Sequence, residues 1–213
     1  MNRFFSQDSI AMRFLTFLCD MMYINFLFFV FSIPIFTMGA SLSAMYSVLF
    51  KRIRDEDPPI MKSFTKAFKE NFKQATLIWI PFLLIICFLF ASLYVAHNLI
   101  GETYSVLQYP IAIFIFLILA VFVFVFPQIA VFQTPTKQIL KNACLLSLAN
   151  LPTTLSFLIV HVLLLLLAGL SPTMTYVVGS VILFLGYATI SYFFSHLFRK
   201  IFNKIIGGEE DAV

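Results

Sequence analysis

Long stretches of this 213-residue chain contain no basic residue. Lysine and arginine are absent from residues 14–50, 74–136 and 142–198. Only 11% of the residues are charged, whereas 61% are hydrophobic. Such a composition leaves too little polar surface to cover a soluble globule. The pattern predicts an all-α, polytopic integral membrane protein in which each stretch without basic residues holds one or two membrane-embedded helices.

The motifs of several enzyme classes are also absent. The sequence has no HExxH, no G-x-S-x-G, no P-loop glycine run and no pair of carboxylates inside an apolar stretch. Zinc peptidases, serine hydrolases and P-loop ATPases each depend on one of these motifs. We therefore expect a non-enzymatic protein with no catalytic residues, no cofactor and no metal site.

The cysteines are few and widely spaced. Cys19, Cys87 and Cys144 lie in or beside apolar segments without CxxC or ligand-like spacing. This arrangement favours reduced, buried side chains over disulfides or metal ligands.

The chain has a net charge of +4, and its basic residues lie between and beyond the apolar stretches. This distribution is typical of the basic residues that mark cytoplasmic loops and contact anionic headgroups, and it does not indicate a nucleic-acid partner. The length allows a single membrane domain over residues 1–213, with five to six membrane-embedded helices and a polar insert at 51–73.

The stretch 14–50 is too long for one span. As a single helix it would extend about 55 Å, against a hydrocarbon core of about 30 Å. Pro34 is the expected break, because it removes a backbone donor and biases the preceding residue away from helical dihedrals. The two pieces form a tight hairpin or re-entrant pair, with Arg13 on the cytoplasmic side. The alternative is a single crossing with Arg13 outside, against the positive-inside bias.

The second piece, 37–50, is rich in small residues. Gly39 and Ser43 form one small-xxx-small pair, and Ala40 and Ala44 form another. Small residues let helix backbones approach closely in membranes, so we expect this piece to pack tightly against other helices.

The polar insert has two faces. If it is helical, apolar side chains follow one face at spacings of three and four, and lysines follow another. The apolar set is Met61, Phe64, Phe68 and Phe72, and the basic set is Lys62, Lys66, Lys69 and Lys73. The pattern predicts a cytoplasmic amphipathic interfacial helix, with phenylalanines in the acyl boundary and lysines on phosphates. A helix that docks a partner protein is the alternative.

The remaining apolar sequence divides into spans separated by turn signals. We expect spans at 75–96, about 110–132, about 151–170 and from Pro172 to about 198. The connection 97–108 and the turn at Ser171 carry no basic residue and are predicted to face outward. In that turn, Ser171 caps the last span and Pro172 occupies its first helical position.

Three polar residues inside apolar segments are candidates for function. Asp20 is interpreted as pairing with cytoplasmic groups or with the amphipathic helix, or alternatively as a proton or cation ligand. His161 is interpreted as a neutral imidazole bonded to a neighbouring helix, or alternatively as a proton relay. Asn25 is expected to form hydrogen bonds between helices.

Two blocks of the sequence resemble the YesL-like family of small bacterial integral membrane proteins of unknown function. The first block runs from Asn25 to Tyr46 and includes Pro34, Thr37 and Gly39. The second matches the pattern F-x-x-x-F-K-x-N-F-K-Q through Phe64, Phe68, Lys69, Asn71, Phe72, Lys73 and Gln74. The resemblance implies a multi-pass protein of the cytoplasmic membrane, mainly of Gram-positive bacteria. It also implies association with genes for sugar uptake, often beside ABC-type permease components.

Two functions are therefore considered. The first is an accessory or regulatory protein of carbohydrate uptake, whose 51–73 insert docks sugar ABC-type permease components. The second is a small permease or channel, assembled by self-association, in which Asp20, His161 and the broken segment near Pro34 line a path.

Overall fold

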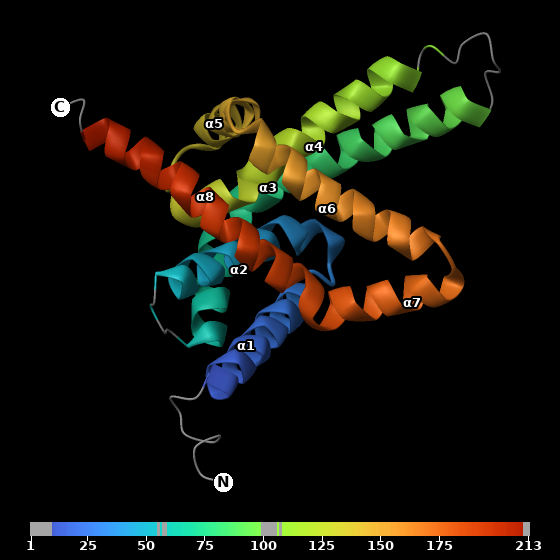
Figure 1. Ribbon diagram of the computed structural model, residues 1–213. Coiled ribbons are helices and arrows are strands. Elements are labelled where there is room, and N and C mark those ends of the chain that lie inside the picture. The colour runs from blue at the N-terminus through green and yellow to red at the C-terminus, as the bar shows by residue number, and fades with distance from the viewer. Residues whose placement is uncertain (1–9, 55, 57–58, 99–105, 107, 211–213) are drawn as a thin grey trace.

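The computed structural model describes residues 10–54, 56, 59–98, 106 and 108–210 (Figure 1). These residues form helices and no strand, which confirms the all-α prediction. The elements are α1 (Ile10–Phe31), the 3-10 helix η1 (Ile35–Thr37), α2 (Met38–Ile53), α3 (Ile60–Asn98), α4 (Gln108–Val131), α5 (Thr136–Ala149), α6 (Leu151–Gly169), α7 (Pro172–Val181), the π-helix η3 (Ile182–Gly186) and α8 (Tyr187–Glu210).

Five helical segments of the described chain are long and apolar enough to cross a membrane. They are Ile10–Phe31, Ile60–Ala96, Gln108–Val131, Leu151–Gly169 and Pro172–Ile205. Large apolar side chains on these segments remain exposed; Leu165, for example, is 73% exposed and Phe88 is 71% exposed. Surfaces of this kind meet lipid rather than water, as expected of a polytopic helical membrane protein.

The first two helices form an antiparallel hairpin. Near the tip, the Ser41 hydroxyl donates to the Phe28 carbonyl at 2.8 Å. At the far end, Arg52 of α2 pairs with Asp20 of α1. Because these contacts are nested around the break at Pro34, the two helices run back along each other. The predicted hairpin arrangement of the two pieces is therefore confirmed. The cytoplasmic side of Arg13 stays a prediction.

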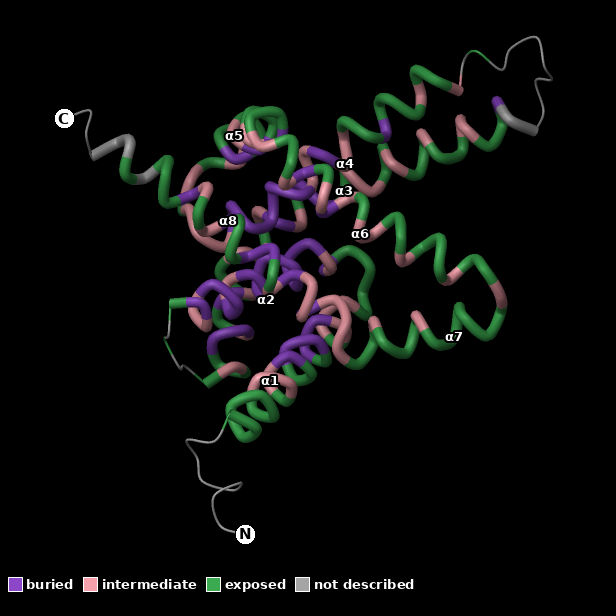
Figure 2. Tube along the Cα trace, in the orientation of Figure 1, coloured by how far each residue is buried: buried purple, intermediate pink, exposed green. Residues whose placement is uncertain are grey.

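Helix α2 lies at the centre of the molecule. Figure 2 shows it as an almost continuous buried segment, and 12 of its 16 residues are buried. Helices α1, α3, α4 and α8 all pack on it. The helix therefore faces protein on nearly every side, and its small residues pack closely against other helices, as their spacing predicted.

Helix α3 corrects the prediction of a separate interfacial helix at 51–73. It runs without interruption for 39 residues and joins the amphipathic segment to the following span. Phe64 is fully buried, and its ring lies 5.3 Å from the ring of Phe31 in α1. Phe68 lies 4.9 Å from the same Phe31 ring. The phenylalanine face therefore packs inside the protein and not in the acyl boundary.

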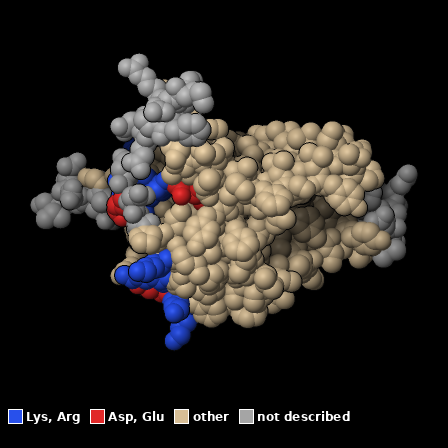
Figure 3. Space-filling view, turned by 90° about the horizontal axis from the view of Figure 1, so that it is seen from below, with Lys and Arg blue, Asp and Glu red and all other residues tan. Residues whose placement is uncertain are grey.

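Tertiary contacts bring the basic segments together. Arg199 of α8 donates to the Ile53 carbonyl at the end of α2, at 2.8 Å. Gln74 of α3 donates to the Thr134 carbonyl before α5, at 2.7 Å. Figure 3 shows the described lysines and arginines gathered at one end of the face in view. We call this region the basic end; it holds Arg52 and Arg54 at the end of α2 and Arg199 on α8, with Lys200 and Lys204 following Arg199 on the same helix.

The turn between α6 and α7 follows the prediction. The Ser171 side chain accepts a hydrogen bond from the Met174 amide at 3.2 Å, and Pro172 begins α7. The last span, however, contains the π-helix η3, which the sequence did not predict. Helix α5 was likewise not predicted. The connection 97–108 lies largely outside the described residues.

Candidate functional site

The tip of the α1–α2 hairpin is closed by polar groups. The Thr37 hydroxyl lies 2.6 Å from the Phe31 carbonyl and 2.7 Å from the Pro34 carbonyl. The indole nitrogen of Trp79 in α3 donates to the Ile35 carbonyl at 2.7 Å. These bonds satisfy backbone groups that the Pro34 break releases, and unsatisfied backbone groups are costly in a membrane. The sequence did not predict this bond, because nothing in the residues around Trp79 indicates Ile35 as its partner.

Gly39 allows the closest approach between α2 and its neighbours. A Cβ atom at this position would lie 2.7 Å from the Trp79 Cβ and 2.9 Å from the Phe126 ring. It would also lie 3.0 Å from the Ala75 carbonyl oxygen. Real Cβ contacts are longer, so only glycine fits here. Ser43, one turn later, is buried and donates to the Ala40 carbonyl of its own helix at 3.0 Å.

Asn25 joins α1 to the π-helix near the start of α8. Its side-chain amide donates to the carbonyls of Ile182 and Leu183, at 2.9 Å and 2.6 Å. Its Oδ1 accepts the Ala188 amide at 3.0 Å. A π-helix leaves backbone groups without their usual partners, and Asn25 supplies three hydrogen bonds at that point. Asn25 thus makes the interhelical bonds that were expected of it.

Asp20 lies at the basic end, where it pairs with Arg52. The two side chains are 18% and 25% exposed, respectively. The pair holds the first half of α1 against the end of α2. Of the two interpretations of Asp20, the geometry therefore favours pairing with a charged group near the end of the hairpin.

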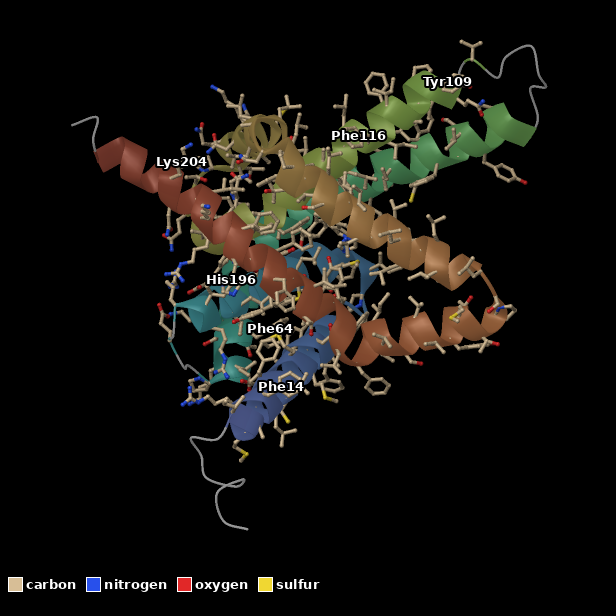
Figure 4. All side chains as sticks on the ribbon, viewed as in Figure 1. Phe14, Phe64, Tyr109, Phe116, His196 and Lys204 are labelled. Atoms are coloured by element: carbon tan, nitrogen blue, oxygen red, sulfur yellow. The ribbon has the colours of Figure 1, made fainter. Side chains whose placement is uncertain are left out.

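The amphipathic half of α3 presents its lysines outward. Lys62, Lys66, Lys69 and Lys73 are all exposed. We call these four residues the lysine face. The phenylalanines on the opposite side pack on the core, and Figure 4 shows Phe64 between α1 and α3. Lys66 lies 3.9 Å from Glu70, and half-buried Asn71 forms no side-chain hydrogen bond within the described residues.

His161 stands apart from the hairpin. Its Nδ1 lies 2.8 Å from the Phe157 carbonyl of its own helix, and its ring stacks on Phe157 at 4.3 Å. The expected bond to a neighbouring helix is not formed within the described chain, and Nε2 is buried without a partner there. The residue borders an apolar cavity of about 300 Å³ between α6 and the α7–α8 segment.

The cysteines differ from their predicted environment. Cys19, Cys87 and Cys144 are free and exposed. The prediction of burial was wrong, because an apolar segment of a membrane protein also presents side chains to lipid. No group of three histidine, cysteine or acidic side chains suited to a metal occurs in the part of the chain that the structure describes.

Fold and site together define a polytopic helical membrane protein built around a buried helical hairpin. Residues 21–93 match the model of a family described as "Protein of unknown function, DUF624". This segment covers the second half of α1, the hairpin tip, α2 and most of α3. No curated protein and no solved structure matches the chain.

Proposed function

We propose that this chain is a non-enzymatic accessory or regulatory protein of carbohydrate uptake in the bacterial cytoplasmic membrane. Its docking surface is the lysine face of α3. The observation that carries the proposal is the division of α3: four lysines are exposed, whereas Phe64 on the opposite side is fully buried. The three phenylalanines of this segment already pack on protein, although Met61 at its start is 44% exposed. Packing of the phenylalanines, and not their insertion into lipid, therefore holds this segment in place.

The lysine face is also connected to the membrane core. Helix α3 is continuous from Ile60 to Asn98, and Trp79 and Gly39 fix it to the buried hairpin. A partner bound at the lysine face would therefore act on the same rigid element that packs on α2. The link to sugar uptake comes from the resemblance of the Asn25–Tyr46 and Phe64–Gln74 blocks to the YesL-like family. The match to the DUF624 family model covers both blocks and supports a family relationship, but that family's function is unknown.

Co-purification from native membranes tests the proposal. The wild-type chain should retain the membrane subunits of a sugar ABC-type permease. The variant with Lys62, Lys66, Lys69 and Lys73 all replaced by glutamine should lose them while remaining inserted. A control with Lys137→Gln and Lys141→Gln removes charge from α5 instead and should retain the permease. Equal recovery from both variants, or no permease with the wild-type chain, would contradict the proposal.

A small permease is the second candidate, and one observation favours it. The buried, unpaired Nε2 of His161 borders the apolar cavity between α6 and the α7–α8 segment. Buried polar groups inside spans are often part of a transport path. Proteoliposomes containing only this chain should show solute flux if this function is correct, and His161→Phe should abolish that flux.

A further inference from the structure

A groove lies at the basic end, between α8 and the junction of α5 with α6. Its volume is about 610 Å³. Lys200 and Lys204 of α8 line it together with Asn150 and Thr153 from the junction. Its other lining residues are apolar: Leu146, Ala149, Leu197, Ile201 and Ile205.

The groove is suited to an anion. Lys200 and Lys204 are four residues apart and therefore lie on one side of α8. Among the side chains that the structure describes, no carboxylate pairs with either lysine. Helix α6 begins beside them, and its N-cap, Asn150, makes no side-chain capping bond. Asn150 also ends α5, so the amides at the start of α6 and the carbonyls at the end of α5 meet here, and the positive charge of the groove comes from the two lysines.

The side chains of helix α5 indicate the level of the groove relative to the membrane. Leu140, Leu145 and Leu148 are 41%, 57% and 53% exposed. Lys137 and Lys141 are exposed on the same short helix. A helix that exposes both leucines and lysines is typical of the membrane interface, with leucines in the acyl boundary and lysines among phosphates. The groove adjoins the end of α5, so it lies at headgroup level. Figure 4 shows Lys204 on the arm of α8 near α5.

We propose that this groove binds one anionic phospholipid. Its phosphate lies between Lys200 and Lys204, with the Thr153 hydroxyl as a further donor. One acyl chain follows Ile201 and Leu197 toward the membrane interior. Charge selects the headgroup, since two cations without a carboxylate partner favour a lipid with net negative charge over a zwitterionic one. The aliphatic walls select a lipid over a soluble phosphate.

Lipid retention by the purified full-length chain tests this site. The protein is exchanged into detergent with defined phosphatidylglycerol or phosphatidylcholine, and bound lipid is measured by native mass spectrometry. We expect wild-type protein to retain one phosphatidylglycerol in preference to phosphatidylcholine. Lys200→Gln with Lys204→Gln should weaken phosphatidylglycerol binding by roughly 30-fold, which corresponds to about 1 kcal/mol for each lysine. The control Lys69→Gln with Lys73→Gln removes the same charge from α3 and should change binding by less than about threefold.

A second variant, which leaves both lysines in place, distinguishes binding of a lipid from binding of a soluble anion. Ala149→Trp fills the apolar side of the groove while keeping its charge, and it should also abolish retention of phosphatidylglycerol. Glycerol 3-phosphate should not displace the lipid. The proposal would be overturned if both double-lysine variants lost phosphatidylglycerol equally, if Ala149→Trp retained it fully, or if glycerol 3-phosphate displaced it.

Discussion

Asn25 completes the backbone hydrogen bonding of Ala188, although the two residues are 163 positions apart in the chain. The same side chain donates to the carbonyls of Ile182 and Leu183. One asparagine of the N-terminal hairpin thus supports an irregular turn in the last span. This contact fixes the hairpin against α8 and makes Asn25 the polar centre of the α1–α8 interface.

We expect Asn25→Leu to destabilise the protein. Leucine has the same branching and the same number of side-chain heavy atoms, but it leaves two partly buried carbonyls and one buried amide without their partner. The cost is about 1–3 kcal/mol for a buried group of this kind. The midpoint of thermal unfolding in detergent should fall by about 5 °C. Asn203→Leu, at an exposed position of α8, is the control and should leave the midpoint unchanged. An unchanged midpoint for Asn25→Leu would show that η3 does not need this side chain.

Gly39→Ala tests the close packing of α2. The new Cβ would lie 2.7 Å from the Trp79 Cβ, so the helices must move apart. Overpacking of this kind costs about 1–3 kcal/mol, and we expect a lower unfolding midpoint. Gly179→Ala is the matched control, because a Cβ atom added there would meet nothing within 4 Å. Equal midpoints for the two variants would mean that α2 and α3 are not in close contact at Gly39.

Phe64→Ala distinguishes an internal phenylalanine from one in lipid. Phe64 is fully buried, so its removal should leave a cavity and lower the free energy of unfolding by about 3–5 kcal/mol. Phe88→Ala is the control, since Phe88 is 71% exposed on the same helix. If Phe64 instead lay in the acyl boundary, the two variants would unfold at similar temperatures, and the packing of Phe64 on Phe31 would be refuted.

The Asp20–Arg52 pair can be measured by a double-mutant cycle. We expect Asp20→Asn and Arg52→Gln to be non-additive, with a coupling free energy of about 1 kcal/mol, because both side chains are partly shielded from solvent. The coupling should decrease as the salt concentration is raised. Additive effects would indicate that the pair contributes nothing to the stability of the hairpin.

Features set by local chemistry were predictable from the sequence. Pro34 breaks the first apolar stretch because it lacks a backbone donor and disfavours helical dihedrals at the residue before it. Ser171 caps α7 because its hydroxyl reaches an amide three residues on. The small residues around Gly39 likewise predicted close packing, since their spacing places them on one side of α2.

Features that depend on distant residues were not predictable in the same way. The spacing of Phe64, Phe68 and Phe72 shows that the helix has an apolar face, but not whether lipid or protein covers it. In the structure Phe31 of α1 contacts Phe64 and Phe68 on this face, and the sequence around these phenylalanines does not indicate that contact. The partners of Asn25 lie more than 150 residues away. The spacing of Ile139, Ala143 and Ser147 is a weak signal for α5, since these are its buried residues.

The sidedness of the hairpin is the most direct test of the account. Single cysteines are introduced at Arg13, Lys69 and Thr173 after Cys19, Cys87 and Cys144 are replaced by serine, and intact cells are treated with an impermeant thiol reagent. We expect labelling from outside only at Thr173, beside the α6–α7 turn, and labelling at Arg13 and Lys69 only after permeabilisation. Labelling of Arg13→Cys from outside would contradict the account, because the first helix would then cross once and would not return with α2 to the basic end.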